Sequence, residues 1–220
     1  MSFTQCINTS GEHQVTTEGL IGPLDAILSI PETPCTSFVA LLGHPHSLQG
    51  GTMNNKVVTT LARVCKELNI PSLRFNFRGV GRSAGHYDGG LGESDDMRLL
   101  AQQWAQQRPN TQFLFAGFSF GSYVAYRAAA QVPKATLITI APPVHHYNYH
   151  ELAPALSDWL VIQGDKDEVV PYSLVQDFVK EETLNHVNMI TLSDTSHFFH
   201  GKLVELKAQL IEFLKPRVGS

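Results

Sequence analysis

Short apolar runs alternate along the chain with longer segments whose apolar residues recur every three or four positions. The strand-like runs cover residues 37–44, 72–77, 111–119, 135–141, 158–164 and 187–193. An earlier segment, 19–30, contains Gly22-Pro23 and is predicted to form a hairpin with its turn there. This alternation predicts an α/β fold with a mostly parallel sheet of about seven to eight strands and helices on both faces.

Helical periodicity is clearest in three segments. Residues 55–68 carry one apolar stripe of Val58, Leu61, Ala62, Cys65 and Leu68. Ser94 is expected to cap the next helix, because Asp95 and Asp96 would stand in its first turn. That helix should bury Met97, Leu100, Ala101 and Trp104. Residues 202–214 form an amphipathic pattern at the end of the chain.

Composition and charge narrow the class of protein. The 220 residues are 43% hydrophobic and 16% charged, with a net charge of −4 and no Lys/Arg cluster. We therefore expect one domain over 1–220, with no nucleic-acid or membrane partner. The three cysteines are widely spaced, and the N-terminus lacks a signal-peptide pattern, which together favour the cytoplasm. These cysteines are Cys6, Cys35 and Cys65.

Two Gly-x-Ser-x-Gly segments, at 117–121 and 81–85, are candidates for a nucleophile turn. A nucleophile on a sharp strand-to-helix turn needs very small residues two positions before and after it. Around Ser119 a strand ends at Gly117, and a helix-compatible run begins after Gly121. Ser83 lacks this context, because "HYDGGLG" follows it and favours a loop. "GVGRSA" also fits a loose dinucleotide fingerprint, but no helix follows to bind a pyrophosphate, and we expect no cofactor.

An acid and a base follow Ser119 in the order that this architecture requires. Asp165, Asp167 and Glu168 lie directly after the strand that ends at Gly164, and we select Asp167 with Asp165 in reserve. His197 follows the next strand and is preferred as the base to His200. All three selected side chains come just after strand ends and should meet at one edge of the sheet.

The negatively charged oxygen of an acyl-transfer intermediate needs two N–H donors. The residue after the nucleophile, Phe120, is expected to supply one. The loop "GHPHSLQGG" follows the strand at 37–44 and should supply the other, which we assign to His46 with Ser47 as the neighbouring alternative.

Other candidate residues flank this expected site. Segment 142–152 follows a strand and should form a short rim, where Tyr147 and Tyr149 would touch substrate. Its histidines, His145, His146 and His150, include a pair four residues apart, but the neighbouring prolines argue against a helical metal site, and we expect none.

Four phenylalanines flank the expected catalytic residues: Phe118, Phe120, Phe198 and Phe199. We expect at least two to pack in the core and assign Phe198 to substrate binding. Arg78 and Arg82 either attract an anionic substrate or pair with Glu93, Asp95 or Asp96.

The segments "GHPHSLQGGTMNNKVV", "LRFNFRGVGRSAG", "GFSFGSYVA", "QGDKDEVVP" and "SHFFHG" together resemble small single-domain α/β hydrolases related to dienelactone hydrolase. The resemblance runs from about residue 19 to the end of the chain. It implies a nucleophile at Ser119, an acid at Asp167 and a base at His197. Dienelactone hydrolase itself uses cysteine as the nucleophile, so the dienelactone substrate is not implied.

The sequence therefore predicts a serine hydrolase of small soluble esters or thioesters. The short connection between 135–141 and 158–164 leaves no room for a large lid. Two alternatives remain at this stage: a binding protein without turnover, and an acyltransferase that uses the same three residues.

Overall fold

A computed structural model describes residues 3–182 and 187–218, which form one continuous eight-stranded sheet in the order β1-β2-β4-β3-β5-β6-β7-β8. The strands from β4 to β8 along this order are parallel, and the β1–β2 hairpin adds an antiparallel edge. The strands are β1 (Gly11–Glu18), β2 (Pro23–Ile30), β3 (Phe38–Gly43), β4 (Ser72–Phe75), β5 (Gln112–Phe118), β6 (Thr136–Ile140), β7 (Asp158–Gly164) and β8 (Val187–Leu192).

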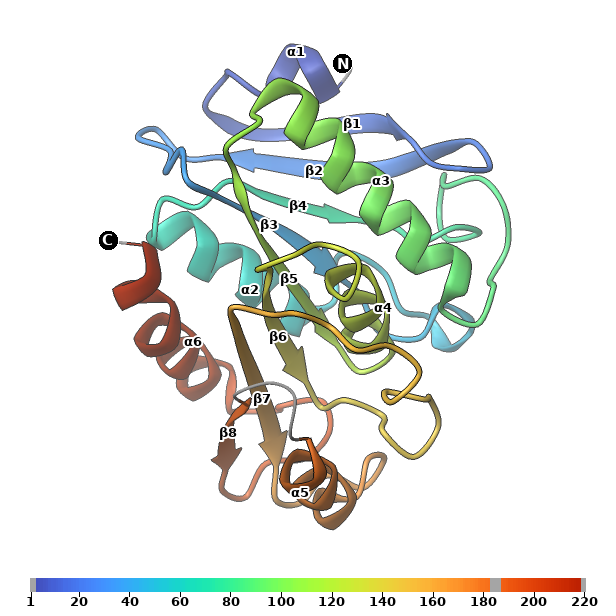
Figure 1. The fold of residues 1–220 in the computed structure, drawn as a ribbon, viewed down its shortest axis with the longest axis vertical. Coiled ribbons are helices and arrows are strands. Elements are labelled where there is room, and N and C mark those ends of the chain that lie inside the picture. The colour runs from blue at the N-terminus through green and yellow to red at the C-terminus, as the bar shows by residue number, and fades with distance from the viewer. Residues whose placement is uncertain (1–2, 183–186, 219–220) are drawn as a thin grey trace.

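Helices cover both faces of this sheet (Figure 1). One face carries α3, α4 and α5, and the other carries α2 and α6. The helices are α1 (Phe3–Cys6), α2 (Lys56–Glu67), α3 (Leu91–Gln107), α4 (Phe120–Ala129), α5 (Tyr172–Glu181) and α6 (Leu203–Val218), with a 3-10 turn η1 (Ser47–Gln49). Because the parallel strands all run the same way, the loops that follow β3, β5, β6, β7 and β8 meet at one edge.

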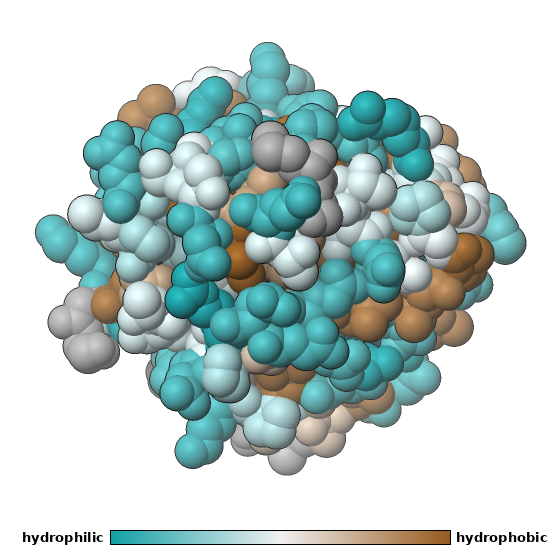
Figure 2. All heavy atoms as spheres, turned by 90° about the horizontal axis from the view of Figure 1, so that it is seen from above, coloured by the Kyte–Doolittle hydropathy of each residue, from teal (hydrophilic) through white to brown (hydrophobic). Residues whose placement is uncertain are grey.

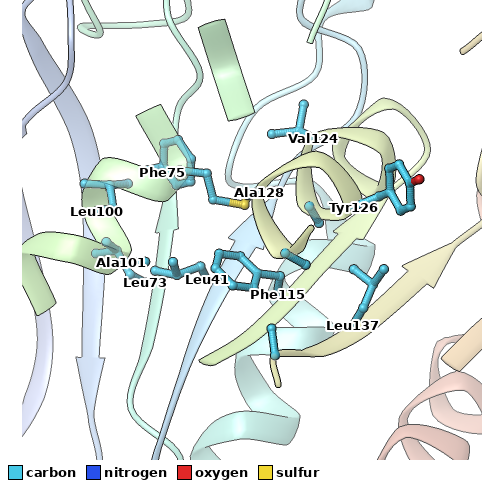
Figure 3. Close-up of a cluster of buried hydrophobic side chains, with 14 of the residues drawn as sticks. Leu41, Leu73, Phe75, Leu100, Ala101, Phe115, Val124, Tyr126, Ala128 and Leu137 are labelled. Carbon is cyan, nitrogen blue, oxygen red and sulfur yellow. The ribbon is translucent and has the colours of Figure 1, made fainter. Parts of the chain in front are cut away.

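The central strands are buried on both sides, as their uninterrupted apolar runs predict. Figure 3 shows part of the core between the sheet and helices α3 and α4. There Leu41 of β3 and Phe115 of β5 lie among Leu100 of α3 and Val124 of α4. This packing fixes β5 and α4, the two elements that flank Ser119.

The molecule presents a mostly hydrophilic face at its β1 edge, with separate hydrophobic patches (Figure 2). Outward-facing positions of β1 are exposed, while Val15 and Thr17 point inward. No helix within the described residues is long and apolar enough to cross a bilayer.

The predicted fold class is confirmed, and so are the six predicted strand segments, which form the parallel part of the sheet, β3 to β8. The hairpin prediction was wrong in extent: β1 lies before residue 19, and the turn occupies 19–22, ahead of Pro23. Ser94 is not the cap of α3, which begins at Leu91 after Gly90. The carboxylate of Glu93 instead accepts the backbone N–H groups of Gly90 and Asp88.

The apolar stripe of α2 is buried as predicted except at Leu68, which is partly exposed. The expected core residues of α3 are all buried. Helices α1 and α5 were not predicted: α1 has only four residues, whereas α5 is amphipathic, buries Val175 and Phe178, and was missed.

Candidate active site

Ser119 lies at the bend between β5 and α4, with φ 53° and ψ −123°. A positive φ is strained for a residue with a side chain, and such strain is typical of a nucleophile held above a sheet. Its backbone N–H donates to the carbonyl of Ile140 at 2.8 Å, which anchors the bend to β6. The Ser119 side chain is left partly exposed at the sheet edge.

Glycine is required on both sides of this bend because three backbone segments crowd together. A Cβ atom on Gly117 would lie 2.0 Å from the carbonyl oxygen of Gly121. A Cβ atom on Gly121 would lie 2.4 Å from the carbonyl oxygen of Gly43, at the end of β3. The small residues that the sequence pattern requires therefore also bring the loop after β3 against the start of α4.

His197 reaches Ser119 from the loop after β8. Its Nε2 lies 3.1 Å from the Ser119 Oγ, although the two residues are 78 positions apart in the chain. Its Nδ1 lies 2.9 Å from Oδ2 and 3.1 Å from Oδ1 of Asp167. With the proton on Nδ1, the ring donates to Asp167 and its Nε2 can accept the hydroxyl proton of Ser119. The structure thus brings the three selected residues into one hydrogen-bonded series.

Asp167 is buried and surrounded by donors. Its Oδ1 accepts the backbone N–H groups of Val169 at 2.9 Å and Val170 at 2.7 Å, and its Oδ2 accepts Nε2 of Gln163 at 3.0 Å. Burial alone would raise the pKa of Asp167, but the hydrogen bond from His197 and the N–H groups of Val170 and Val169 together lower it below the ordinary value. The carboxylate is therefore held ionised beside the imidazole.

The reserve acid, Asp165, does not contact the imidazole. Its Oδ1 accepts the backbone N–H of Thr195 at 3.3 Å, and Glu168 accepts the backbone N–H of His197 at 3.2 Å. The two neighbouring acids therefore connect the loop after β7 to the loop after β8. Gln163 was missed in the sequence; its signal is a buried polar residue near the end of an apolar strand.

The loop after β3 is held by His44, which is fully buried. Its Nδ1 donates to the carbonyl of Pro45 at 2.7 Å, and its Nε2 accepts the backbone N–H of Phe77 at 2.9 Å. Burial lowers the pKa of His44 to about 4, against the opposing effect of the Pro45 carbonyl, so the ring is neutral. His44 thereby fixes the backbone directly before His46.

The side chains of the two expected oxyanion donors pack together. The His46 ring lies 5.1 Å from the Phe120 ring, centroid to centroid, and 4.9 Å from Tyr87. Phe120 is the first residue of α4, so its N–H has no acceptor within the helix. Ser47 begins the turn η1 beside His46. Phe120 directly follows Ser119 in the chain, and the close approach of Gly121 to Gly43 brings the start of the loop that carries His46 against this end of α4.

The rim over this edge is formed by residues 141–157, which contain no helix or strand and are all described. Tyr147 lies 5.5 Å from the Phe120 ring and stacks on Tyr123 at 4.5 Å. Its hydroxyl is 3.3 Å from that of Tyr87. Tyr147 is partly exposed and therefore lies where a substrate could touch it.

The expectation for Tyr149 was wrong, because this side chain is buried at 2% exposure. Its hydroxyl donates to Ser122 Oγ at 3.0 Å, and Ser122 in turn donates to the carbonyl of Ser119 at 2.6 Å. Tyr126 donates to the carbonyl of Tyr149. Tyr149 therefore anchors the rim to α4 instead of facing a substrate.

Three of the four flanking phenylalanines pack in the core: Phe118, Phe120 and Phe199. Phe198 is exposed, and its ring lies 5.1 Å from that of His197. His200 is also exposed and contacts the Phe198 ring at 6.0 Å.

The second Gly-x-Ser-x-Gly segment is a structural loop. Ser83 is buried; its Oγ accepts the backbone N–H of Asp25 at 3.0 Å and donates to the carbonyl of Asn76 at 2.7 Å. Residues 84–90 form no helix or strand, and α3 begins only at Leu91. The dinucleotide fingerprint therefore lacks the helix that it would need.

The two arginines of this region are paired. Arg78 donates to Asp96 at 2.8 Å and lies 3.6 Å from Asp88, while Arg82 donates to Asp25 at 2.8 Å. Of the partners expected from the sequence, only Asp96 forms an ion pair with Arg78.

The rim histidines do not form a helical pair. The rings of His145 and His146 lie 3.9 Å apart, centroid to centroid, tilted by 41°, and His150 packs on Phe178. Burial and the neighbouring His146 lower the pKa of His145, against the opposing charge of Asp167. Among residues 3–182 and 187–218, no three His, Cys, Asp or Glu side chains are grouped to hold a metal ion.

A mostly parallel sheet covered on both faces, with a serine raised on the bend after its central strand, defines the α/β-hydrolase class of proteins. Comparison with known proteins agrees. The structure of XC6422 from Xanthomonas campestris, an α/β serine hydrolase without lid, is 41% identical, covers 97% of this chain and 98% of its own, and superposes with a TM-score of 0.90. An α/β serine hydrolase homologue from Coxiella burnetii is 40% identical, covers 94% and 99%, and gives a TM-score of 0.86.

The chain therefore belongs to the α/β-hydrolase superfamily. The uncharacterized protein RP471 of Rickettsia prowazekii (strain Madrid E) is 35% identical over 206 residues, which is 90% of this chain and 85% of that protein. A dienelactone hydrolase from Anabaena variabilis shares the fold at 15% identity and a TM-score of 0.75 over 93% of this chain and 97% of its own. No protein-family model matches the chain.

Proposed function

We propose that this protein is a cytoplasmic serine hydrolase that cleaves small carboxylic esters or thioesters without a cofactor. The observation that carries the proposal is the unbroken series of contacts from Asp167 through His197 to Ser119, at 2.9 and 3.1 Å. A serine hydroxyl becomes an effective nucleophile when a neighbouring base takes its proton, and an acid that orients the base fixes the reactive tautomer.

In the first half-reaction, Ser119 Oγ attacks the acyl carbonyl carbon while its proton passes to Nε2 of His197. The carbonyl π electrons move onto oxygen and give a tetrahedral intermediate. This intermediate collapses, the bond to the leaving oxygen or sulfur breaks, and His197 returns the proton to that atom. Asp167 stays ionised throughout and stabilises the imidazolium.

The negative charge on the intermediate is stabilised by the N–H groups of Phe120 and His46. The first belongs to the N-terminus of α4, where the helix dipole also favours negative charge. The second follows the backbone that His44 holds through two hydrogen bonds. Removal of one such donor typically costs about 10²–10³ in rate.

In the second half-reaction, water attacks the acyl-serine. His197 takes the proton of the water and returns it to Ser119 as the acid product leaves. Tyr147, which is partly exposed beside Phe120, and Phe198, which is exposed beside His197, are proposed to contact the substrate. The absence of a helix or strand in the described rim 141–157 suits a site open to small substrates.

Hydrolysis of nitrophenyl esters and acyl-CoAs of graded acyl length tests the proposal. We expect turnover of short nitrophenyl esters by the native chain and none above background by Ser119→Ala. A native chain that hydrolyses none of these substrates, or a Ser119→Ala variant that keeps native turnover, would contradict it.

A further inference from the structure

Phe198 differs from its three neighbouring phenylalanines because it is held outside the core. It is 48% exposed, whereas Phe118, Phe120 and Phe199 are exposed by at most 1%. Phe199 has a φ of 54°, and its N–H donates to the carbonyl of Ser196 at 3.1 Å. This tight turn directs Phe199 inward and leaves Phe198 outside. The exposed part of this side chain gains nothing from the hydrophobic effect until another apolar group covers it.

The exposed ring is placed beside the catalytic imidazole. The Phe198 and His197 rings meet edge to face, with centroids 5.1 Å apart and an interplanar angle of 84°. The Phe198 ring also lies 6.5 Å from that of buried Phe118, with an angle of 71°. The ring of His200 is a third neighbour, at 6.0 Å, and Phe198 stays 48% exposed.

The chemistry decides which part of a substrate lies next to this ring. The leaving atom must receive its proton from Nε2 of His197, so it lies within hydrogen-bond distance of that nitrogen when the intermediate collapses. The oxygen of the substrate's carbonyl points away from His197, toward the N–H groups of Phe120 and His46. The leaving group is therefore on the His197 side of Ser119, next to Phe198.

The aromatic residues on the other side belong to the oxyanion donors. Tyr147 and Tyr87 each lie 5.5 Å from the Phe120 ring, and their hydroxyls are 3.3 Å apart. Tyr147 and Tyr87 thus contact the residue that supplies an oxyanion donor, whereas Phe198 contacts the base, and the two aromatic groups are inferred to meet different parts of the substrate.

We infer that Phe198 forms the leaving-group subsite, and that this enzyme favours esters of apolar, flat alcohols such as aryl or arylmethyl alcohols. This inference rests on the proposed serine hydrolase function and extends it to one half of the substrate. Because the leaving group departs with the first half-reaction, Phe198 acts on acylation and not on hydrolysis of the acyl-serine.

Two acetates that share the acyl group and differ in the alcohol, benzyl acetate and ethyl acetate, provide the test. In Phe198→Ala, kcat/KM for benzyl acetate should fall about tenfold, since loss of a well-packed apolar contact typically costs about that factor. For ethyl acetate it should change less than about twofold, because that alcohol is too small to cover the ring. Phe198→Tyr, which keeps the ring, should retain the native preference.

The rate of acyl-serine hydrolysis, measured after the burst with nitrophenyl acetate, should be the same in Phe198→Ala and the native chain. Leu20→Ala is the matched control, because Leu20 is an apolar side chain of similar exposure, 54%, on the β1–β2 turn. Leu20→Ala should leave kcat/KM unchanged for both benzyl acetate and ethyl acetate. In Tyr147→Ala, by contrast, kcat/KM should change by the same factor for both acetates.

Equal losses on the two acetates in Phe198→Ala, or a slower hydrolysis of the acyl-serine, would overturn the inference while leaving serine hydrolase activity intact. A native chain inactive on every ester would instead remove the proposed function on which the inference rests.

Discussion

The carboxylate of Asp167 and the imidazole of His197 meet at 2.9 Å, with both side chains buried. An aspartate in this place accepts the Nδ1 proton and leaves Nε2 free to accept from Ser119. In Asp167→Asn the amide can donate to the ring and favour the opposite tautomer, so kcat should fall by about 10⁴ with little change in KM.

Steady-state kinetics on a nitrophenyl ester would measure this loss, and Asp165→Asn is the matched control on the same loop. Within the described part of the chain, the Asp165 carboxylate accepts from the backbone N–H of Thr195 and does not contact His197, so its variant should keep most of the activity. If kcat fell further in Asp165→Asn than in Asp167→Asn, the assignment of Asp167 as the acid would be wrong.

His44 makes the free energy of unfolding depend on pH. Its folded-state pKa is about 4, below the ordinary 6.5, so the stabilisation is fully present above pH 6.5 and is lost as the pH falls toward 4. Native stability should drop through this window by up to about 3 kcal/mol more than that of His44→Asn, which does not titrate there. Denaturant unfolding of both proteins at pH 7, 5.5 and 4.5 would measure the difference. If the free energy of unfolding changed with pH equally in the native chain and in His44→Asn, His44 would not be held neutral by burial.

The crowding at the nucleophile bend predicts a large effect of a single methyl group. Gly117→Ala should destabilise the chain by at least about 3 kcal/mol, because its Cβ would lie 2.0 Å from the Gly121 carbonyl oxygen. Gly50→Ala is the comparison: a Cβ there meets nothing within 4 Å, and only its φ of 78° is unfavourable, at about 1 kcal/mol. Thermal unfolding would rank the two variants. Equal effects would mean that the backbone contact at the bend is not tight.

The fold and the three residues of the hydrogen-bonded series could be predicted because both depend on local patterns. Each of Ser119, Asp167 and His197 lies in the turn or loop that follows a predicted strand, and parallel strands bring their ends to one edge. The position of Tyr149 could not be predicted in the same way, because its burial depends on a long-range contact with Ser122 of α4. Ser94 failed for a different reason. The carboxylate of Asp88 accepts the backbone N–H of Gly92 in the first turn of α3 at 3.1 Å, and Glu93 accepts the N–H groups of Gly90 and Asp88 just before the helix. The helix therefore begins before Ser94 without a cap from its hydroxyl.

Ser83 and Ser119 occur in the same pentapeptide pattern but differ in what holds their hydroxyls. The Ser83 hydroxyl is hydrogen-bonded to backbone groups of Asp25 and Asn76. Ser83→Ala should therefore lower the free energy of unfolding by about 1–3 kcal/mol and leave Ser119 reactive. Ser119 faces His197 instead, and its replacement should leave the fold intact and remove the nucleophile.

Labelling with a fluorophosphonate probe tests the central claim most directly, since the probe reacts only with a serine activated by a neighbouring base. The native chain and folded Ser83→Ala should be labelled at Ser119, and Ser119→Ala should not be labelled. A native chain that resists the probe, or a Ser119→Ala variant that is labelled as fast as the native chain, would contradict the account.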